Sequence, residues 1–179
     1  MLAQQLWQTN IHEARLLAAF IDDPRQVNKQ QMEQWALDFN SWDICDQVCN
    51  HLFRKTPFAH QMALKWSRAQ AEFVKRAGFV LMAVLAVHDK KSGDQPFLDF
   101  LKIIQQESQD ERNFVKKAVN WALRQIGKRN LSLHQAALKT AEQINQIDSK
   151  SAGWIATDAL RELRSDKILS KLKTARDKQ

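Results

Sequence analysis

The segment Asp110–Arg129 constrains the fold more than any other stretch of the chain, because it follows a helical periodicity from end to end. Its apolar residues recur at the spacing of a buried helix face: Val115, Ala118, Val119, Ala122 and Ile126. Asp110 and Glu111 suit the N-terminal end of a helix dipole, and Gly127 followed by two basic residues marks the exit. The segment therefore predicts one amphipathic helix with a buried side.

The other side of this helix carries only basic and neutral polar residues: Lys116, Lys117, Asn120, Arg124 and Lys128, with Trp121 at the edge. A solvated helix face usually mixes both charge signs. A basic face beside an aromatic residue is what a helix lying along a polyanion needs. A basic face that serves only solubility remains the alternative.

The composition of the whole chain favours an all-α fold. Its 179 residues are 44% hydrophobic and include only four Gly and three Pro, and no stretch alternates like a strand. We expect a single domain over residues 1–179, with Asn10 as an N-cap and a C-terminal helix whose end frays. The expected helices are 2–7, 11–21, 28–39, 42–54, 58–67, 71–88, 97–106, 110–129, 131–147, 151–164 and one from about 166.

Internal repeats refine this fold class. FVKRA at 73–77 recurs as FVKKA at 114–118, and ALRQI at 122–126 recurs as ALREL at 159–163. Periods near 40 residues are typical of stacked helix pairs, so we predict a HEAT-like right-handed α-solenoid of antiparallel helix pairs. Corresponding helices would line its concave face and form one basic groove from Lys75, Arg76, Lys116, Lys117, Arg124, Arg161 and Arg164.

Charge and cysteine usage bear on the partner and the compartment. The net charge is +7; residues 1–60 carry five Lys or Arg and seven Asp or Glu, whereas residues 61–179 carry twenty-two and thirteen. This asymmetry favours a nucleic acid or another polyanion as partner. Cys45 and Cys49 lack a second pair at zinc-ligand spacing and indicate buried thiols in a reducing compartment. No run is apolar enough to span a membrane, and the start lacks the shape of a secretory signal, so we expect a cytoplasmic protein. We also expect it to be a monomer.

The expected helix 42–54 places two functional side chains together. Its buried stripe is Ile44, Cys45, Val48, Cys49 and Leu52. Trp42 and Asp46 lie one turn apart on the flank, so an indole and a carboxylate project side by side. The alternative is that Trp42 only packs at the start of the helix and Asp46 is an exposed acid, because the spacing would then be the same. Three further aromatic residues could serve either a groove or the core: Trp66, Trp121 and Trp154.

Three stretches together resemble the AlkD-type DNA alkylation-repair proteins. They are SWDICD at 41–46, RNFVKKAVNWALRQIGK at 112–128, and WIA at 154–156 with DALREL at 158–163. The resemblance covers nearly the whole chain. It implies a HEAT-like α-solenoid and a hydrolase, a monofunctional DNA glycosylase that excises cationic N3- or N7-alkylpurines from duplex DNA. It implies no metal and no other cofactor, and it implies a location in the cytoplasm, on the nucleoid in a prokaryote.

The resemblance also assigns residues. Trp42 and Asp46 resemble the family's catalytic indole and carboxylate, Arg124 its arginine that contacts the DNA backbone, and Trp154 its second site tryptophan. Family members usually have helices before the region where this chain starts, so the chain resembles either a shortened member or an incomplete copy. Some relatives keep the fold without excising bases. A non-catalytic module that binds nucleic acid or protein through the same groove therefore stays open.

The residue types suit the chemistry that the resemblance implies. A purine alkylated at N3 or N7 is a cationic leaving group, so it departs without a general acid. The sugar that remains becomes oxocarbenium-like. Asp46 could stabilise this positive charge or orient the attacking water, and the Trp42 ring could add a cation–π attraction of about 0.5–2 kcal/mol.

Overall fold

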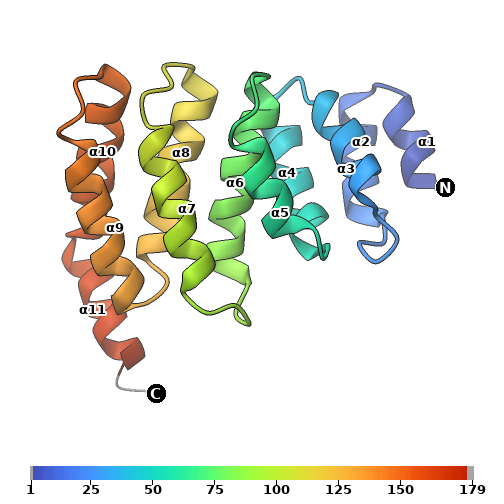
Figure 1. Cartoon of the computed structure of the whole chain (residues 1–179). Helices are drawn as coiled ribbons and strands as arrows, with labels where there is room; N and C mark the ends of the chain where they lie inside the picture. The colour runs from blue at the N-terminus through green and yellow to red at the C-terminus, as the bar shows by residue number, and fades with distance from the viewer. Residues whose placement is uncertain (1, 177–179) are drawn as a thin grey trace. The chain divides into compact units, whose positions relative to one another are not determined.

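The computed structural model describes residues 2–176, with side chains as far as Thr174, and every regular element in this range is helical (Figure 1). The elements are α1 Leu2–Gln8, α2 His12–Ile21, α3 Lys29–Leu37, α4 Trp42–His51, the 3-10 helix η1 Phe53–Lys55, α5 Ala59–Trp66, α6 Glu72–His88, α7 Gln95–Gln106, α8 Asn113–Gly127, α9 Leu131–Ile144, α10 Lys150–Leu163 and α11 Asp166–Arg176. The prediction of an all-α chain is confirmed, and the expected end of the tail at 177–179 lies outside the described residues.

Several helix ends differ from the prediction by a few residues, and two of these differences have a local cause. Helix α8 begins at Asn113, and Asp110 lies before it, where its carboxylate accepts a hydrogen bond of 3.1 Å from the backbone N–H of Arg112. Asn10 is not an N-cap: it adopts a left-handed backbone with φ 59°, and Ile11 takes the cap position of α2. Both differences arise where a polar side chain can serve either a turn or a cap.

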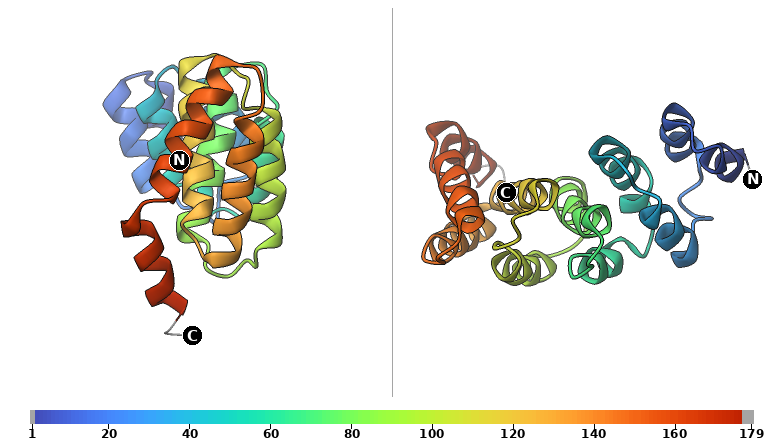
Figure 2. Two further views of the ribbon diagram at one scale, coloured as in Figure 1. Left: turned by 90° about the vertical axis from the view of Figure 1, so that its left-hand side faces the viewer. Right: turned by 90° about the horizontal axis from the view of Figure 1, so that it is seen from above.

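Contacts within the chain define two compact units, Met1–Leu81 and Met82–Gln179, and the boundary falls within α6. The expectation of a single domain stays a prediction. In the first unit, α2 packs against both α1 and α4. In the second unit, α8 packs against α9 and α10, and α7 packs against α8 and α9. The right panel of Figure 2 shows α7–α10 end-on as two adjacent pairs.

The repeated motifs fall on alternate helices of this arrangement. FVKRA lies on α6, FVKKA and ALRQI lie on α8, and ALREL lies on α10. Each period therefore spans two helices, as expected for a helix-pair repeat. The predicted buried face of α8 is confirmed, because all five of its apolar residues are fully buried. Helix α6 is buried from Val74 to Ala86, as its apolar sequence predicts.

The core of the first unit is rich in aromatic rings. Trp7 and Trp35 stack with centroids 4.0 Å apart and planes 2° apart, and Phe53 packs between Trp35 and Trp66 at 6.3 and 5.8 Å. Trp66 is 3% exposed and therefore belongs to the core. No helix among the described residues is long and apolar enough to cross a membrane.

Candidate active site

Helix α4 presents Trp42 at its first turn. Ser41 precedes the helix in an extended conformation, and its hydroxyl donates to Asp43 Oδ1 at 2.6 Å instead of capping the helix. The predicted apolar stripe of α4 is confirmed, since its residues are all 0–1% exposed. With that stripe in the core, Trp42 projects outward and is 54% exposed. The face of the indole is therefore accessible to a ligand.

Asp46, one turn below Trp42, is held by a buried arginine of α6. Arg76 Nε donates to Asp46 Oδ1 at 2.9 Å and Arg76 Nη2 donates to Asp46 Oδ2 at 2.8 Å. The guanidinium and the carboxylate therefore form a bidentate ion pair. The side chain of Arg76 is 7% exposed and that of Asp46 is 18% exposed. The carboxylate is therefore fixed in direction and shielded from most water.

Two opposing effects act on this carboxylate. Burial raises the pKa of Asp46 above its usual value, with a further contribution from the charge of Asp43, while the hydrogen bonds and charge of Arg76 lower the pKa. Arg76 therefore favours the ionised form of a carboxyl group whose burial favours the protonated form. An ionised carboxylate with a fixed orientation can stabilise a developing cation without reorganising.

The two cysteines help to set the register between α4 and α6. The Cys45 thiol donates to the carbonyl of Phe73 at 3.7 Å, and the Cys49 thiol donates to the carbonyl of Ala77 at 3.8 Å. Both thiols are free and buried, and burial raises the pKa of Cys49 well above its usual value. They are therefore structural thiols, not nucleophiles. Their position brings Asp46 opposite Arg76.

A second pair anchors α4 from the other side. His12 Nε2 lies 2.7 Å from Asp43 Oδ2, which connects α2 to α4 directly beside Trp42. Burial pushes the pKa of Asp43 up, but hydrogen bonds from Ser41, the Ile44 backbone and His12 outweigh it and leave the pKa lowered. The start of α4 is thus held on both flanks. Sequence alone does not reveal this contact, because the partners are 31 residues apart.

Lys75 and Arg76 were expected to line a DNA-facing surface, yet they are only 8% and 6% exposed. The expectation that this pair lies open to a polyanion is therefore wrong. The equivalent residues of the second copy of the motif differ, because Lys116 is half-buried and Lys117 is exposed. Arg76 is buried because it meets the carboxylate of Asp46.

The basic face of α8 is also occupied. Carboxylates of α10 meet it: Asn120 donates to Asp158 at 2.7 Å, Lys128 lies 2.7 Å from Glu162, and Arg124 pairs with Glu162 and lies 3.6 Å from Asp158. Three residues of the predicted basic face, two on α8 and one at its C-cap, therefore already have acidic partners on α10. Arg161 on α10 also pairs with Asp158. The assignment of Arg124, Lys128 and Arg161 to DNA binding stays a prediction.

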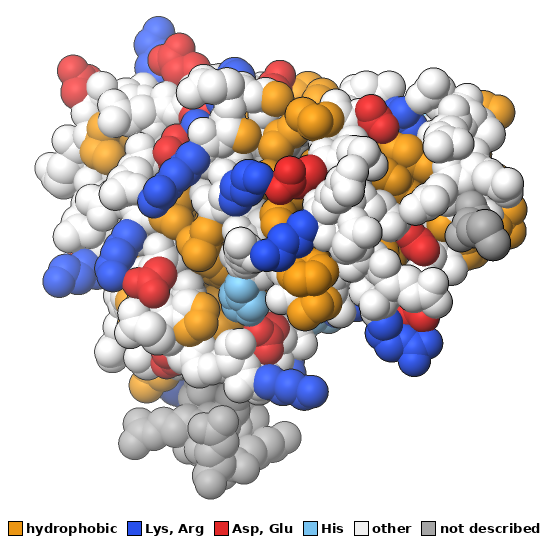
Figure 3. Space-filling view, turned by 45° about the vertical axis from the view of Figure 1, so that its right-hand side comes forward, with side chains coloured by type: hydrophobic (Ala, Val, Ile, Leu, Met, Phe, Trp, Pro, Cys, Tyr) orange, Lys and Arg blue, Asp and Glu red, His pale blue; other side chains and the backbone are white. Residues whose placement is uncertain are grey.

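Two of the expected DNA-binding residues remain accessible in the second unit. Lys117 is exposed and forms no ion pair with any described residue. Trp154 is 41% exposed, and the Lys116 ammonium lies 5.3 Å from the centre of its ring. Elsewhere the surface is mixed: on the face in Figure 3, Lys and Arg side chains lie among acidic and apolar ones. The expected single groove would join residues of both units, and it stays a prediction.

The ion pairs between α8 and α10 allow a stability test. Replacing Arg124 with Ala leaves Asp158 and Glu162 with fewer partners, so we expect the free energy of unfolding to fall by about 1–2 kcal/mol. Lys117→Ala on the same helix should change it by less than about 0.5 kcal/mol. Urea denaturation of both variants measures the difference. Equal stabilities would contradict a structural role for the Arg124 pairs.

Comparison with known proteins agrees with this helical architecture. A solved structure described as "A new family of proteins related to the HEAT-like repeat DNA glycosylases with affinity for branched DNA structures" superposes with a TM-score of 0.72, at 20% identity, over 90% of this chain and 74% of the other. The predicted HEAT-like fold is thereby confirmed. No curated protein matches the sequence. The family model described as "DNA alkylation repair enzyme" matches residues 1–163, and the chain therefore belongs to the DNA alkylation repair enzyme family.

Proposed function

We propose that this protein is a DNA glycosylase that excises cationic N3- or N7-alkylpurines from duplex DNA. The observation that carries the proposal is the Asp46 carboxylate, fixed by Arg76 one turn below the exposed Trp42. Family membership supports action on alkylated DNA. As further proposals, the protein acts as a cytoplasmic, nucleoid-associated monomer and needs no cofactor.

The proposed chemistry needs little from the protein. The alkylated purine already carries a positive charge, so it can leave without being protonated. As the glycosidic bond breaks, positive charge grows on the sugar, and the Asp46 carboxylate stabilises it electrostatically. Trp42 contacts the sugar or the departing base through the face of its ring, which contributes about 0.5–2 kcal/mol. Water completes the hydrolysis on the sugar.

Arg76 takes a different role from the one that the sequence suggested. It is a positioning residue, because its guanidinium holds Asp46 through two hydrogen bonds and its side chain is buried. Lys117 is the basic residue of α8 best placed to meet a phosphate, since it is exposed. When DNA binds, a phosphate would replace the carboxylate partner of three basic residues, Arg124, Lys128 and Arg161. The DNA backbone would also pass beside Trp154 and Lys116.

The pH dependence of base release tests the role of Arg76. Asp46 acts when ionised, so release should fall as the pH drops through the pKa of Asp46. In Arg76→Gln the lowering effect of the guanidinium is lost while the raising effect of burial remains, so the acid limb should move to higher pH. Single-turnover release is measured between about pH 4 and 8 for the parent and for Arg76→Gln, and spontaneous depurination is subtracted. The two profiles give the acid limb of each protein.

Arg76→Lys is the matched control, because it keeps a positive charge without the two-pronged grip. Its acid limb should lie between those of the parent and Arg76→Gln. Thermal melting of each variant identifies any loss of folding. An acid limb that stays at the parental pH in a folded Arg76→Gln protein would refute the positioning role.

Lesion selectivity tests the proposed reaction itself. A duplex with one N7-methylguanine should release free base, whereas a matched duplex with a neutral lesion such as hypoxanthine should release none, because no described residue of the site is assigned to protonate a leaving base. Chromatography of the released base distinguishes the two. Equal release from both duplexes would contradict a mechanism that depends on a cationic leaving group.

A second function is favoured by one observation. The superposing structure belongs to proteins described as having affinity for branched DNA. The protein would then bind branched DNA without excising a base. Competition between a four-way junction and a linear duplex of equal length tests this function. A strong preference for the junction, together with no base release from methylated duplex, would favour the binding module over the glycosylase.

A further inference from the structure

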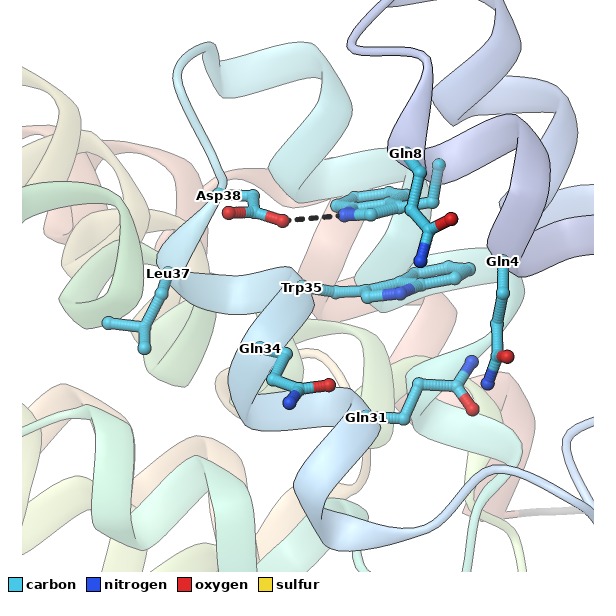
Figure 4. Close-up of a pocket in the computed structure, with 8 residues that line it drawn as sticks. Gln4, Gln8, Gln31, Gln34, Trp35, Leu37 and Asp38 are labelled. Carbon is cyan, nitrogen blue, oxygen red and sulfur yellow. Dashed lines mark hydrogen bonds between the residues drawn. The ribbon is translucent and has the colours of Figure 1, made fainter.

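A cleft of about 490 Å³ opens between α1 and α3 in the first unit. Its lining consists of Gln4, Trp7 and Gln8 from α1 and Gln31, Gln34, Trp35, Leu37 and Asp38 from α3 and its C-terminal end. Figure 4 shows the glutamines arranged around Trp35. A cleft of this volume lies within the range of about 300–1,000 Å³ typical of small-molecule sites.

The floor of the cleft is rigid. Trp7 and Trp35 stack 4.0 Å apart, and Trp7 Nε1 donates to Asp38 Oδ2 at 2.8 Å (Figure 4). On Trp7, the guanidinium of Arg15 lies 5.0 Å from the ring centre and also donates to the carbonyl of Asp38 at 3.1 Å. Both indoles are only 3–4% exposed. The floor of the cleft is therefore rigid, but it has no open ring face on which a ligand could stack.

The walls of the cleft carry unused hydrogen-bonding groups. Gln31 is committed, because its amide nitrogen donates to Asp22 Oδ2 at 2.6 Å. Gln4, Gln8 and Gln34 are exposed, and their amides form no hydrogen bond with any other described residue, so these amides face solvent at the rim. Each primary amide offers two donor hydrogens and an acceptor oxygen. The walls can therefore meet a ligand that has donors and acceptors on adjacent atoms.

The charges of the lining limit what can bind. Asp38 is the one ionisable side chain among the lining residues, and no Lys or Arg is among them. A phosphate or another anion would therefore meet a carboxylate and no cation. The ligand that remains is neutral or cationic and polar along its edge.

We propose that this cleft binds an unpaired nucleobase through its hydrogen-bonding edge. A glutamine amide can form two hydrogen bonds with the edge of a base such as adenine, and the walls supply three uncommitted amides for this purpose. Leu37 on the rim is 72% exposed and offers an apolar contact for the flat face of the base. The proposal does not depend on base excision at Asp46.

The nucleobase that binds in the cleft could belong to a free nucleoside or to an unpaired nucleotide within a DNA strand. The test titrates the ¹⁵N-labelled protein with adenosine, guanosine, cytidine and thymidine, and with a bulged duplex that carries one unpaired adenine. The ¹H–¹⁵N resonance of Trp7 Nε1 reports on the floor, and the side-chain amide resonances report on the walls. We expect saturable shifts with at least one probe. A fully paired duplex of the same length is the control, and the bulged duplex should bind more strongly than this control if the cleft takes a base from a DNA strand.

The double variant Gln8→Leu/Gln34→Leu keeps the size of the side chains and removes two amides, so affinity for the binding probe should fall about tenfold or more. Gln135→Leu on α9 is the control and should bind like the parent. Base release by the double variant should be unchanged if the glycosylase proposal holds, so failure of one proposal does not imply failure of the other. No saturable shift with any probe, or parental affinity in a folded double variant, would overturn the proposal.

Discussion

Replacing Asp46 with Asn is expected to slow base release from methylated duplex DNA by about 100-fold or more. The change keeps the shape of the side chain and removes the charge that is proposed to stabilise the sugar. Such a loss of a fixed electrostatic group corresponds to about 2.7 kcal/mol or more. Affinity for DNA should stay the same or rise slightly, because one negative charge leaves a surface that binds a polyanion. Single-turnover release and fluorescence anisotropy measure the two effects separately.

Two further variants make this result specific. Asp99→Asn removes an exposed acid of α7 that pairs with Lys102, and its release rate should match the parent. Trp42→Ala should reduce release with little effect on melting, because the indole is 54% exposed. Parental release by a folded Asp46→Asn protein would contradict the catalytic assignment and favour the binding module.

Replacing Gly78 with Ala is expected to destabilise the protein strongly. A Cβ at this position would lie 2.4 Å from the backbone nitrogen of Ser67 and 2.8 Å from the carbonyl carbon of Trp66. Backbone atoms cannot rotate away, so α5 and α6 would have to separate. We expect a loss of about 3 kcal/mol or more, which corresponds to a fall in Tm of roughly 6–12 °C.

Gly153→Ala on α10 is the matched control, because no atom lies within 4 Å of its added Cβ. Alanine favours a helix over glycine, so this variant should be about 0.5–1 kcal/mol more stable than the parent. Thermal melting of both proteins gives the comparison. A Gly78→Ala protein that melts at the parental temperature would show that α5 and α6 do not approach so closely in solution.

The helical architecture could be predicted from the sequence because it depends on local periodicity. The apolar face of α8 and the stripe of α4 both recur at helical spacing, and every residue of these stripes is buried. The repeated motifs predicted helix pairs, and they fall on α6, α8 and α10. Trp42 and Asp46 could be paired in advance because they are one turn apart on a single helix.

The partners of charged residues could not be predicted in the same way. Arg76 meets Asp46 across 30 residues, and Arg124 meets Glu162 across 38, so no local pattern links them. The two copies of the motif FVK(R/K)A are nearly identical, yet Arg76 is buried and Lys117 is exposed. What distinguishes them is a carboxylate on another helix. Local sequence thus indicates which face is basic, and packing decides which basic residues stay free.

The most direct measurement of the central claim is single-turnover release of free base from a duplex with one N7-methylguanine, with protein in excess at saturating concentration. If Asp46 and Trp42 form an excising site, free N7-methylguanine should accumulate well above spontaneous depurination and leave an abasic duplex. The Asp46→Asn protein should reduce this release toward background. DNA that is fully bound yet releases no base above background would contradict the account.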